Sequence, residues 1–117
     1  MMRMRKKTTN RQPLTTTTVN GKIRYEFSAK LWQHALQGGW HFVSLPKKLS
    51  KEIRQHLGWQ EEGWGRLKAT AKTGASEWET AIWFDTKQNT YLLPVKTVVR
   101  KKENLPAGKT VKIILWV

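Results

Sequence analysis

The residues from Tyr91 to Val117 constrain the fold of this chain more than any other stretch. An apolar run ends there at Pro94. Proline cannot donate an N–H to a sheet ladder and favours the first turn of a helix. We therefore expect a short helix directly after Pro94, with Val95, Val98 and Val99 on one of its sides.

A turn and a second strand complete this unit. Pro106 and Gly108, in the sequence NLPAG, are typical of a turn that ends regular structure. After the turn, apolar side chains at Val111, Ile113 and Leu115 alternate with other residues, which is the period of a strand with one buried face. The predicted order is strand, Leu-Pro corner, helix, glycine turn and strand.

The same order of elements is predicted earlier in the chain. The clearest strand spans Ile23 to Leu31, where every second residue is apolar. The apolar run WHFVSL then ends at Pro46. An amphipathic helix is expected after it and should end at Gly58, with one face formed by Leu49, Ile53 and Leu57. A strand around Leu67, Ala69 and Ala71 should follow.

Two similar segments in one chain suggest two half-barrels, over residues 22–73 and 77–116. The fold class predicted is mainly β: a single-chain double-split β-barrel built from two strand-strand-helix-strand halves. Leu45-Pro46 and Leu93-Pro94 should then occupy matching places. Because one chain supplies both halves, we expect a monomer or a weak dimer.

The domain boundary is predicted near residue 20. Residues 1–20 hold five basic residues and four consecutive threonines, with almost no apolar side chains. Such a segment cannot bury enough surface to offset its ordering entropy, so it is predicted to be a basic disordered tail. Residues 21–117 should form the barrel domain.

The second unit resembles the swapped-hairpin unit of AbrB-type transcription regulators. The span from about Ile23 to Val117 resembles more closely a bacterial family, the domain-of-unknown-function 1905 family. The segments that carry this resemblance are FSAKLW, WHFVSLP, YLLPVKTVVRK and GKTVKIIL. It implies a double-split β-barrel and no established activity.

Charge favours a polyanionic partner. The chain has 22 Lys and Arg against 8 Asp and Glu, a net charge of +14. Seventeen basic and eight acidic residues lie after residue 20, so the predicted domain alone carries +9. Nucleic acid is the partner that this excess indicates, although such charge can also serve only solubility.

Several other classes of protein are disfavoured. There is no cysteine, and no apolar run approaches the roughly 18 residues of a membrane span. Residues from Thr8 onward are polar where a signal peptide needs an apolar core, so a cytoplasmic protein without membrane contact is expected. The histidines His34, His41 and His56 do not form a helix-face metal pair, and no catalytic motif is present. We therefore expect no enzyme, metal or cofactor.

The hairpin between the halves can be predicted pair by pair. With a loop at residues 73–76, the inner pairs are Ala71 with Trp78, Ala69 with Thr80 and Leu67 with Ile82. The outer pairs are Lys72 with Glu77, Thr70 with Glu79, Lys68 with Ala81 and Arg66 with Trp83. The outer lysines and arginine could form a stripe for phosphates, at about 6.6 Å spacing. Alternatively they make ordinary cross-strand contacts, such as a cation–π contact of Arg66 with Trp83.

The tryptophans allow two interpretations as well. Trp78 should face the core, whereas Trp32, Trp83 and Trp116 fall on the opposite face of their strands. These three could stack on bases or on a flat ligand, or they could pack beneath the helices. Residues 40, 59 and 64, also tryptophans, flank glycines and have no predicted role.

The favoured function is a non-enzymatic binding module with sequence-tolerant nucleic-acid binding through helix and strand faces. The candidate residues, expected in two separate positive patches, are Lys47, Lys51, Arg54, Arg66, Lys68, Lys72, Lys96, Arg100 and Lys101. The alternative is a small-ligand or anion-binding barrel, with its pocket at the tryptophan face or at the corner from Pro94 to Arg100. Arg100 could instead bond carbonyls at the helix end.

Overall fold

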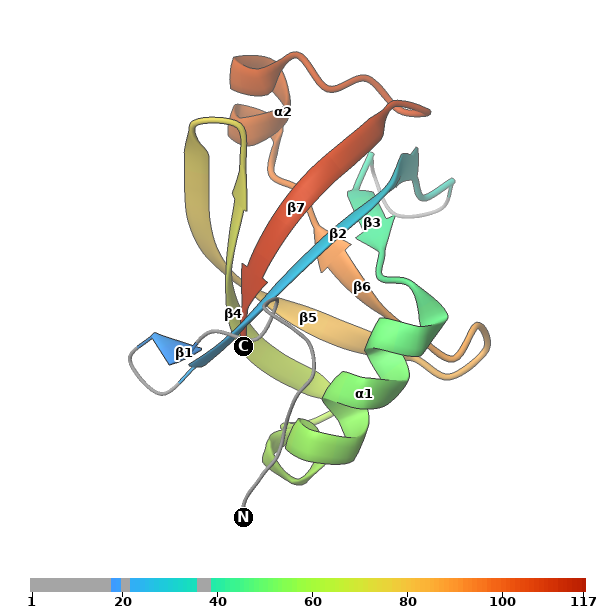
Figure 1. The fold of residues 1–117 in the computed structure, drawn as a ribbon. Coiled ribbons are helices and arrows are strands. Elements are labelled where there is room, and N and C mark those ends of the chain that lie inside the picture. Colours follow the sequence, from blue (N-terminus) through green and yellow to red (C-terminus); the bar gives the residue numbers. More distant parts are fainter. Residues whose placement is uncertain (1–17, 20–21, 36–38) are drawn as a thin grey trace.

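The structure, a computed structural model, describes residues 18–19, 22–35 and 39–117. Within this part of the chain, strands β2 to β7 form a closed barrel and two helices cover it (Figure 1). The barrel strands are β2 (Lys22–Gln33), β3 (His41–Ser44), β4 (Arg66–Thr73), β5 (Ser76–Asp85), β6 (Thr90–Pro94) and β7 (Thr110–Trp116). The helices are α1 (Lys47–Leu57) and α2 (Thr97–Glu103), and a 3₁₀ turn, η1 (Gly58–Gln60), follows α1.

The strand order confirms a mainly β fold made of two equivalent halves. Neighbouring strands run in the order β2-β3-β6-β5-β4-β7, and β7 returns to pair with β2. All of these pairings are antiparallel. Each half contributes a long strand, a short strand, a helix and a last strand. The helices lie at opposite ends of the barrel (Figure 1).

The two Leu-Pro corners occupy matching places, as predicted. Leu45-Pro46 directly follows β3 and Leu93-Pro94 ends β6, and these two strands pair antiparallel with Val43 opposite Leu93. The pairing of these two strands continues beyond the end of β3, because the Leu45 N–H donates to the Tyr91 carbonyl at 2.9 Å. Leu45 and Leu93 are both fully buried. A pseudo-twofold axis therefore passes between the two short strands.

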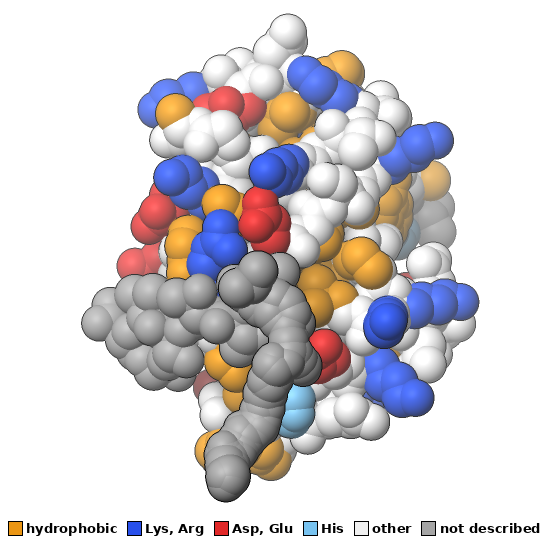
Figure 2. All heavy atoms as spheres, viewed as in Figure 1, with side chains coloured by type: hydrophobic (Ala, Val, Ile, Leu, Met, Phe, Trp, Pro, Cys, Tyr) orange, Lys and Arg blue, Asp and Glu red, His pale blue; other side chains and the backbone are white. Residues whose placement is uncertain are grey.

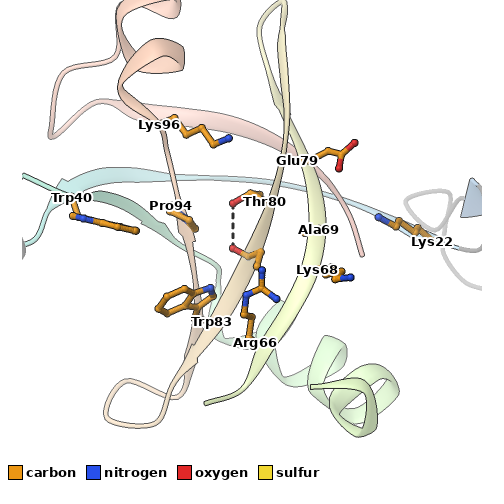
Figure 3. Close-up of a pocket in the computed structure, with 11 residues that line it drawn as sticks. Lys22, Trp40, Arg66, Lys68, Ala69, Glu79, Thr80, Trp83, Pro94 and Lys96 are labelled. Carbon is orange, nitrogen blue, oxygen red and sulfur yellow. Dashed lines mark hydrogen bonds between the residues drawn. The ribbon is translucent and has the colours of Figure 1, made fainter. Parts of the chain in front are cut away.

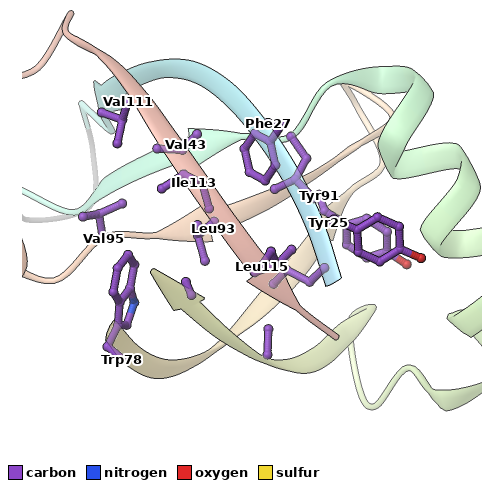
Figure 4. Close-up of a cluster of buried hydrophobic side chains, with 14 of the residues drawn as sticks. Tyr25, Phe27, Val43, Trp78, Tyr91, Leu93, Val95, Val111, Ile113 and Leu115 are labelled. Carbon is purple, nitrogen blue, oxygen red and sulfur yellow. The ribbon is translucent and has the colours of Figure 1, made fainter. Parts of the chain in front are cut away.

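Alternating side chains from all six strands fill the barrel (Figure 4). The β4–β5 ladder has the predicted register throughout, with Ala71 opposite Trp78 and Leu67 opposite Ile82. Thr73 still pairs with Ser76, so the loop proper is only two residues long. Gly74 takes a positive φ of 56° there, a conformation that costs glycine little.

Helix α1 forms as its amphipathic pattern predicts. Pro46 is its N-cap residue and Gly58 its C-cap residue. Ile53 is fully buried, and Leu49 and Leu57 pack partly buried against the core. Ser50 is also buried, and its hydroxyl accepts a 3.0 Å hydrogen bond from the Tyr91 N–H.

Helix α2 begins later than predicted. Pro94 is still part of β6, opposite Phe42, and the Val95 N–H donates to the His41 carbonyl at 3.0 Å. Strand pairing therefore continues past the proline, because a proline at a strand end sacrifices only its own N–H. The helix starts at residue 97, so Val95 lies before it, and the prediction that Val95, Val98 and Val99 share one side of the helix is wrong. Val98 is 67% exposed, whereas Val95 and Val99 are buried.

The predicted disordered tail, residues 1–20, lies outside the described residues except for β1 (Thr18–Val19), which pairs with the start of β2. Among the helices of the described ranges, none is long and apolar enough to span a membrane.

Candidate functional site

A groove of about 510 Å³ crosses the outer face of the barrel over β4, β5 and β6 (Figure 3). Its lining combines indole rings with cationic side chains. The residues that line it are Lys22, Trp40, Arg66, Lys68, Ala69, Glu79, Thr80, Ala81, Trp83, Pro94 and Lys96. Four of these residues are basic and one is acidic.

The two indole rings of the groove are accessible. Trp83 points outward from β5, opposite Leu92 of β6, and is 42% exposed. Trp40 precedes β3, is 50% exposed and stacks on Phe42, with ring centroids 5.9 Å apart. Figure 3 shows both rings close to Pro94. Each ring therefore has a surface that a planar group could cover.

The basic residues come from both halves of the chain. Arg66 and Lys68 project from β4, and Lys96 lies between β6 and α2. The Arg66 guanidinium pairs with the Glu62 carboxylate at 2.9 Å, and the contact with the Trp83 ring, one of the two alternatives for this face, is not found among the described residues. Both partners of this ion pair are exposed, so it holds Arg66 only weakly.

The cation–π contact found in the described residues lies elsewhere. The Arg54 guanidinium is 3.8 Å from the centre of the Phe84 ring and 3.5 Å from the Glu61 carboxylate. Arg54 therefore ties α1 to β5 and to the segment before β4. Its predicted contact with nucleic acid competes with these two internal partners.

The prediction of two separate positive patches is corrected in one respect. Lys96, which belongs to the second Leu-Pro corner, shares the groove with Arg66 and Lys68 because strand pairing carries the chain past Pro94. The other predicted residues do not line this groove: Lys47, Lys51, Arg54, Lys72, Arg100 and Lys101. Basic side chains do gather over α1, whereas on the β2–β7 face they alternate with acids (Figure 2).

The tryptophans predicted to lie on the outer face differ in their surroundings. The Trp32 ring packs 5.3 Å from that of Phe42, and its N–H donates to the Ser44 hydroxyl at 2.9 Å. Trp116 is half-buried, opposite Arg24 of β2. Of the three, only Trp83 lines the groove. Trp40 was missed, although it precedes Phe42 by two residues and so shares its parity.

A second pocket, of about 310 Å³, adjoins the groove at the corner between β6 and α2. We call it the corner pocket. It shares Trp40, Pro94 and Lys96 with the groove and adds His41 and Arg100. Arg100 does bond a backbone carbonyl, but that of Val95, before the helix rather than at its end.

The family of the chain follows from one comparison. The model of the family described as Domain of unknown function (DUF1905) matches residues 27–115. The chain belongs to the DUF1905 family. The match spans both Leu-Pro corners and every groove residue except Lys22. No curated protein matches the chain.

Two tyrosines lie in the core of this DUF1905 barrel, toward the end covered by α1 (Figure 4). Burial raises the pKa of the Tyr25 hydroxyl to about 12, and the charge of Glu52 adds to this effect. Burial also raises the pKa of the Tyr91 hydroxyl, which donates a hydrogen bond to the Glu61 carboxylate. Both phenols stay protonated at neutral pH, and neither lines the groove.

Metal ligands do not converge in the part of the chain that the structure describes, where no group of His, Asp and Glu side chains could hold an ion. The lining of the groove supplies indole rings and basic side chains. It can hold planar groups and anions.

Proposed function

We propose that this DUF1905 chain is a non-enzymatic module that binds single-stranded nucleic acid with little base preference. The observation that carries the proposal is the groove in which two exposed indole rings lie among four basic side chains and one acidic one. Stacking on an indole is open to every base, and contacts with phosphates carry no sequence information. Both features favour sequence-tolerant binding.

Stacking would supply the attraction for bases. Base–aromatic stacking contributes about 1 to 3 kcal/mol per base. Trp83 lies in β5 and Trp40 directly precedes β3, and these two strands flank β6, with adjacent strands about 4.8 Å apart. The two rings therefore suit bases a few nucleotides apart on one flexible strand. A duplex would present only its terminal base faces, because its internal bases are already stacked.

Phosphate contacts would supply the rest of the affinity. Three of the basic side chains that border the groove are Lys96, Lys68 and Arg66. When they neutralise phosphates, the nucleic acid releases its condensed counterions. The single acidic residue, Glu79, reduces this charge only in part. Affinity should therefore fall steeply with salt.

A second candidate, binding of a small anion, is favoured by the corner pocket, whose lining holds two cations and no carboxylate. Because this pocket shares three lining residues with the groove, the two functions are compatible. We further propose a monomer, which the closure of the barrel by a single chain supports, and a cytoplasmic location.

The test is fluorescence anisotropy with labelled DNA and RNA strands of about 12 nucleotides at low salt, beside a duplex of the same length. Single strands should bind at micromolar protein and the duplex more weakly. Trp83→Ala should weaken binding by about tenfold, the equivalent of one lost stacking contact. Trp64→Ala is the matched control, because Trp64 is 92% exposed but lies outside the groove.

Two results would overturn the proposal. One is the absence of any anisotropy change at tens of micromolar protein. The other is binding that Trp83→Ala and Trp40→Ala leave unchanged, since the groove would then not be the binding surface.

A further inference from the structure

The Arg100 guanidinium is held in one orientation by three neighbours. Its Nε donates to the Val95 carbonyl at 3.3 Å, and its Nη2 donates to the Thr97 hydroxyl at 2.8 Å. Its Nη1 lies 3.5 Å from His41 Nε2. A guanidinium has five N–H donors. One N–H on each terminal nitrogen is therefore left for a ligand.

His41 serves this arrangement as a hydrogen-bond acceptor. Its Nδ1 lies 2.6 Å from the Gly39 carbonyl, which can only accept, so Nδ1 carries the ring proton. In the neutral ring Nε2 then keeps its lone pair, which faces Arg100. A backbone carbonyl thus fixes the tautomer, and the tautomer helps to fix the arginine.

The pocket beside Arg100 has the charge of an anion site. Its lining includes Lys96 and Arg100 and no carboxylate. Its volume of about 310 Å³ lies at the lower end of the range for small-ligand pockets. Trp40 lines one side and is supported from behind by Phe42, which leaves half of its surface exposed.

We infer that the corner pocket binds a phosphomonoester joined to a base: a free nucleotide or the phosphorylated end of a nucleic-acid strand. The Arg100 fork and Lys96 take the phosphate, and the base stacks on Trp40. Arginine suits this role because its planar fork matches two phosphate oxygens. The inference rests on the proposed function only where the ligand is a strand end.

Charge favours a phosphomonoester over an internal phosphodiester. A phosphomonoester carries close to two negative charges at neutral pH, whereas each internal phosphate of a strand carries one. Lys96 and Arg100 together match the higher charge. The extended Val95-Lys96 segment brings the second cation to the pocket, because the helix does not start until Thr97.

The main experiment compares one DNA sequence with a 5′-phosphate, a 3′-phosphate or hydroxyl groups at both ends. The native protein should bind one phosphorylated strand about tenfold more tightly than the hydroxyl-ended strand. Arg100→Gln should reduce that preference to less than twofold and leave the affinity for the hydroxyl-ended strand within about threefold. Lys101→Gln, on the next residue of the same helix, should keep the full preference.

Two further variants help to separate a lost phosphate contact from a folding defect. Arg100→Lys keeps the charge but loses the fork, so it should retain only part of the preference. Lys96→Gln removes the second cation without touching the hydrogen bonds of Arg100. Melting temperatures of all variants show whether the barrel is intact.

Adenosine monophosphate and adenosine test the free-nucleotide source. Thermal stabilisation by the monophosphate alone, lost in Arg100→Gln, would support the pocket even if no strand binds. Equal affinity for phosphorylated and hydroxyl-ended strands, together with no effect of the monophosphate, would overturn the inference. Binding of all strands through Trp83 without an end preference would overturn the inference but not the proposed function.

Discussion

The two halves of the barrel share one plan and differ where the groove lies. Tyr25 of β2 faces Leu115 of β7, and at the equivalent place in the other half Trp78 of β5 faces Ala71 of β4. These inward positions are apolar in both halves. The shared plan therefore builds the barrel, and the departures from it are free to build a binding surface.

The main departure follows the two Leu-Pro corners. In the first half α1 begins at Lys47, immediately after Pro46. In the second half Val95 continues the sheet and Lys96 stays extended before α2 begins. This difference carries Lys96 to the groove, so an asymmetry of only two residues decides where a cation lies.

The connections after the helices differ as well. In the second half Asn104 takes a left-handed conformation, with a φ of 55°, and Leu105 is buried. In the first half the 3₁₀ turn leaves Trp59 81% exposed. Helix α2 is also fastened to the β4–β5 hairpin, because the Ser76 hydroxyl donates to the Glu103 carboxylate at 2.6 Å. One half thus closes its end of the core, and the other leaves an aromatic side chain in solvent.

The largest expected effect tests the symmetry itself. Leu45→Ala and Leu93→Ala should each lower the free energy of unfolding by about 3 kcal/mol, because both side chains are fully buried at equivalent corners. Chemical denaturation measures both losses. Leu92→Ala, at a half-buried neighbour on the outer face, is the control and should cost less. If either substitution lowered the free energy of unfolding by less than about 1 kcal/mol, the two Leu-Pro corners would not be equivalent.

The next effect concerns Tyr25, the first-half counterpart of Trp78. Its pKa is about 12 in the folded chain and about 10 when unfolded, so above pH 10 the unfolded state loses this proton first. The folded state should therefore lose roughly 2 to 3 kcal/mol of stability between pH 10 and 12 through this group. Urea denaturation across that range, on the native chain and on Tyr25→Phe, measures the difference.

Tyr25→Phe should also be stabilising below pH 10, by about 1 kcal/mol. The Tyr25 hydroxyl is buried and has no hydrogen-bond partner among the described residues, so its removal relieves an unmet donor. Tyr91→Phe should do the opposite, because the Tyr91 hydroxyl bonds to Glu61. If the free energy of unfolding of the native chain and of Tyr25→Phe fell equally between pH 10 and 12, Tyr25 would not be the group responsible for the loss.

A smaller effect, on the affinity for a single strand, distinguishes Lys48 from Lys96. Each of these lysines lies two residues after the proline of its corner. Lys96→Gln should weaken binding of a single strand by about threefold to fivefold and reduce the salt slope by about 0.7, the value for one lost phosphate contact. Lys48→Gln should change neither quantity, because Lys48 lies on α1 and does not line the groove. Equal losses in both variants would mean that charge acts without regard to place.

The smallest effect concerns the residues just before the last strand of each half. Trp64 has a φ of 63°, and Gly108, at the equivalent place, has a φ of 93°. A side chain is strained at such angles and glycine is not. Trp64 is 92% exposed, so Trp64→Gly loses little burial and should stabilise the fold by about 0.5 kcal/mol. Thermal melting measures the change, and a loss of stability would show that Trp64 has a contact that matters.

Local patterns predicted most of the barrel. Three predictions that depend on residues close in sequence are confirmed. They are the alternation of buried and exposed residues in β2 and β4, the apolar face of α1 and the register of the β4–β5 hairpin. The start of α2 was not predictable in this way. It depends on the Val95 N–H reaching the His41 carbonyl, a contact between residues of different halves.

The candidate site shows the same division. The alternation of side chains along the strand placed Trp83 on the outer face, and the excess of Lys and Arg indicated a basic surface. The neighbours of each basic side chain were not visible: Arg54 over Phe84, Arg66 beside Glu62 and Arg100 against His41. These contacts join segments far apart in the chain, so no local pattern records them.

The order of residues alone thus determined the two Leu-Pro half-barrels, the inward face of each strand and the excess of positive charge. Only the tertiary structure decided that Trp40, Trp83 and Lys96 lie along one groove. The physical reason is that periodicity fixes which way a side chain points from its own strand. The closure of the sheet fixes which side chains become neighbours across strands.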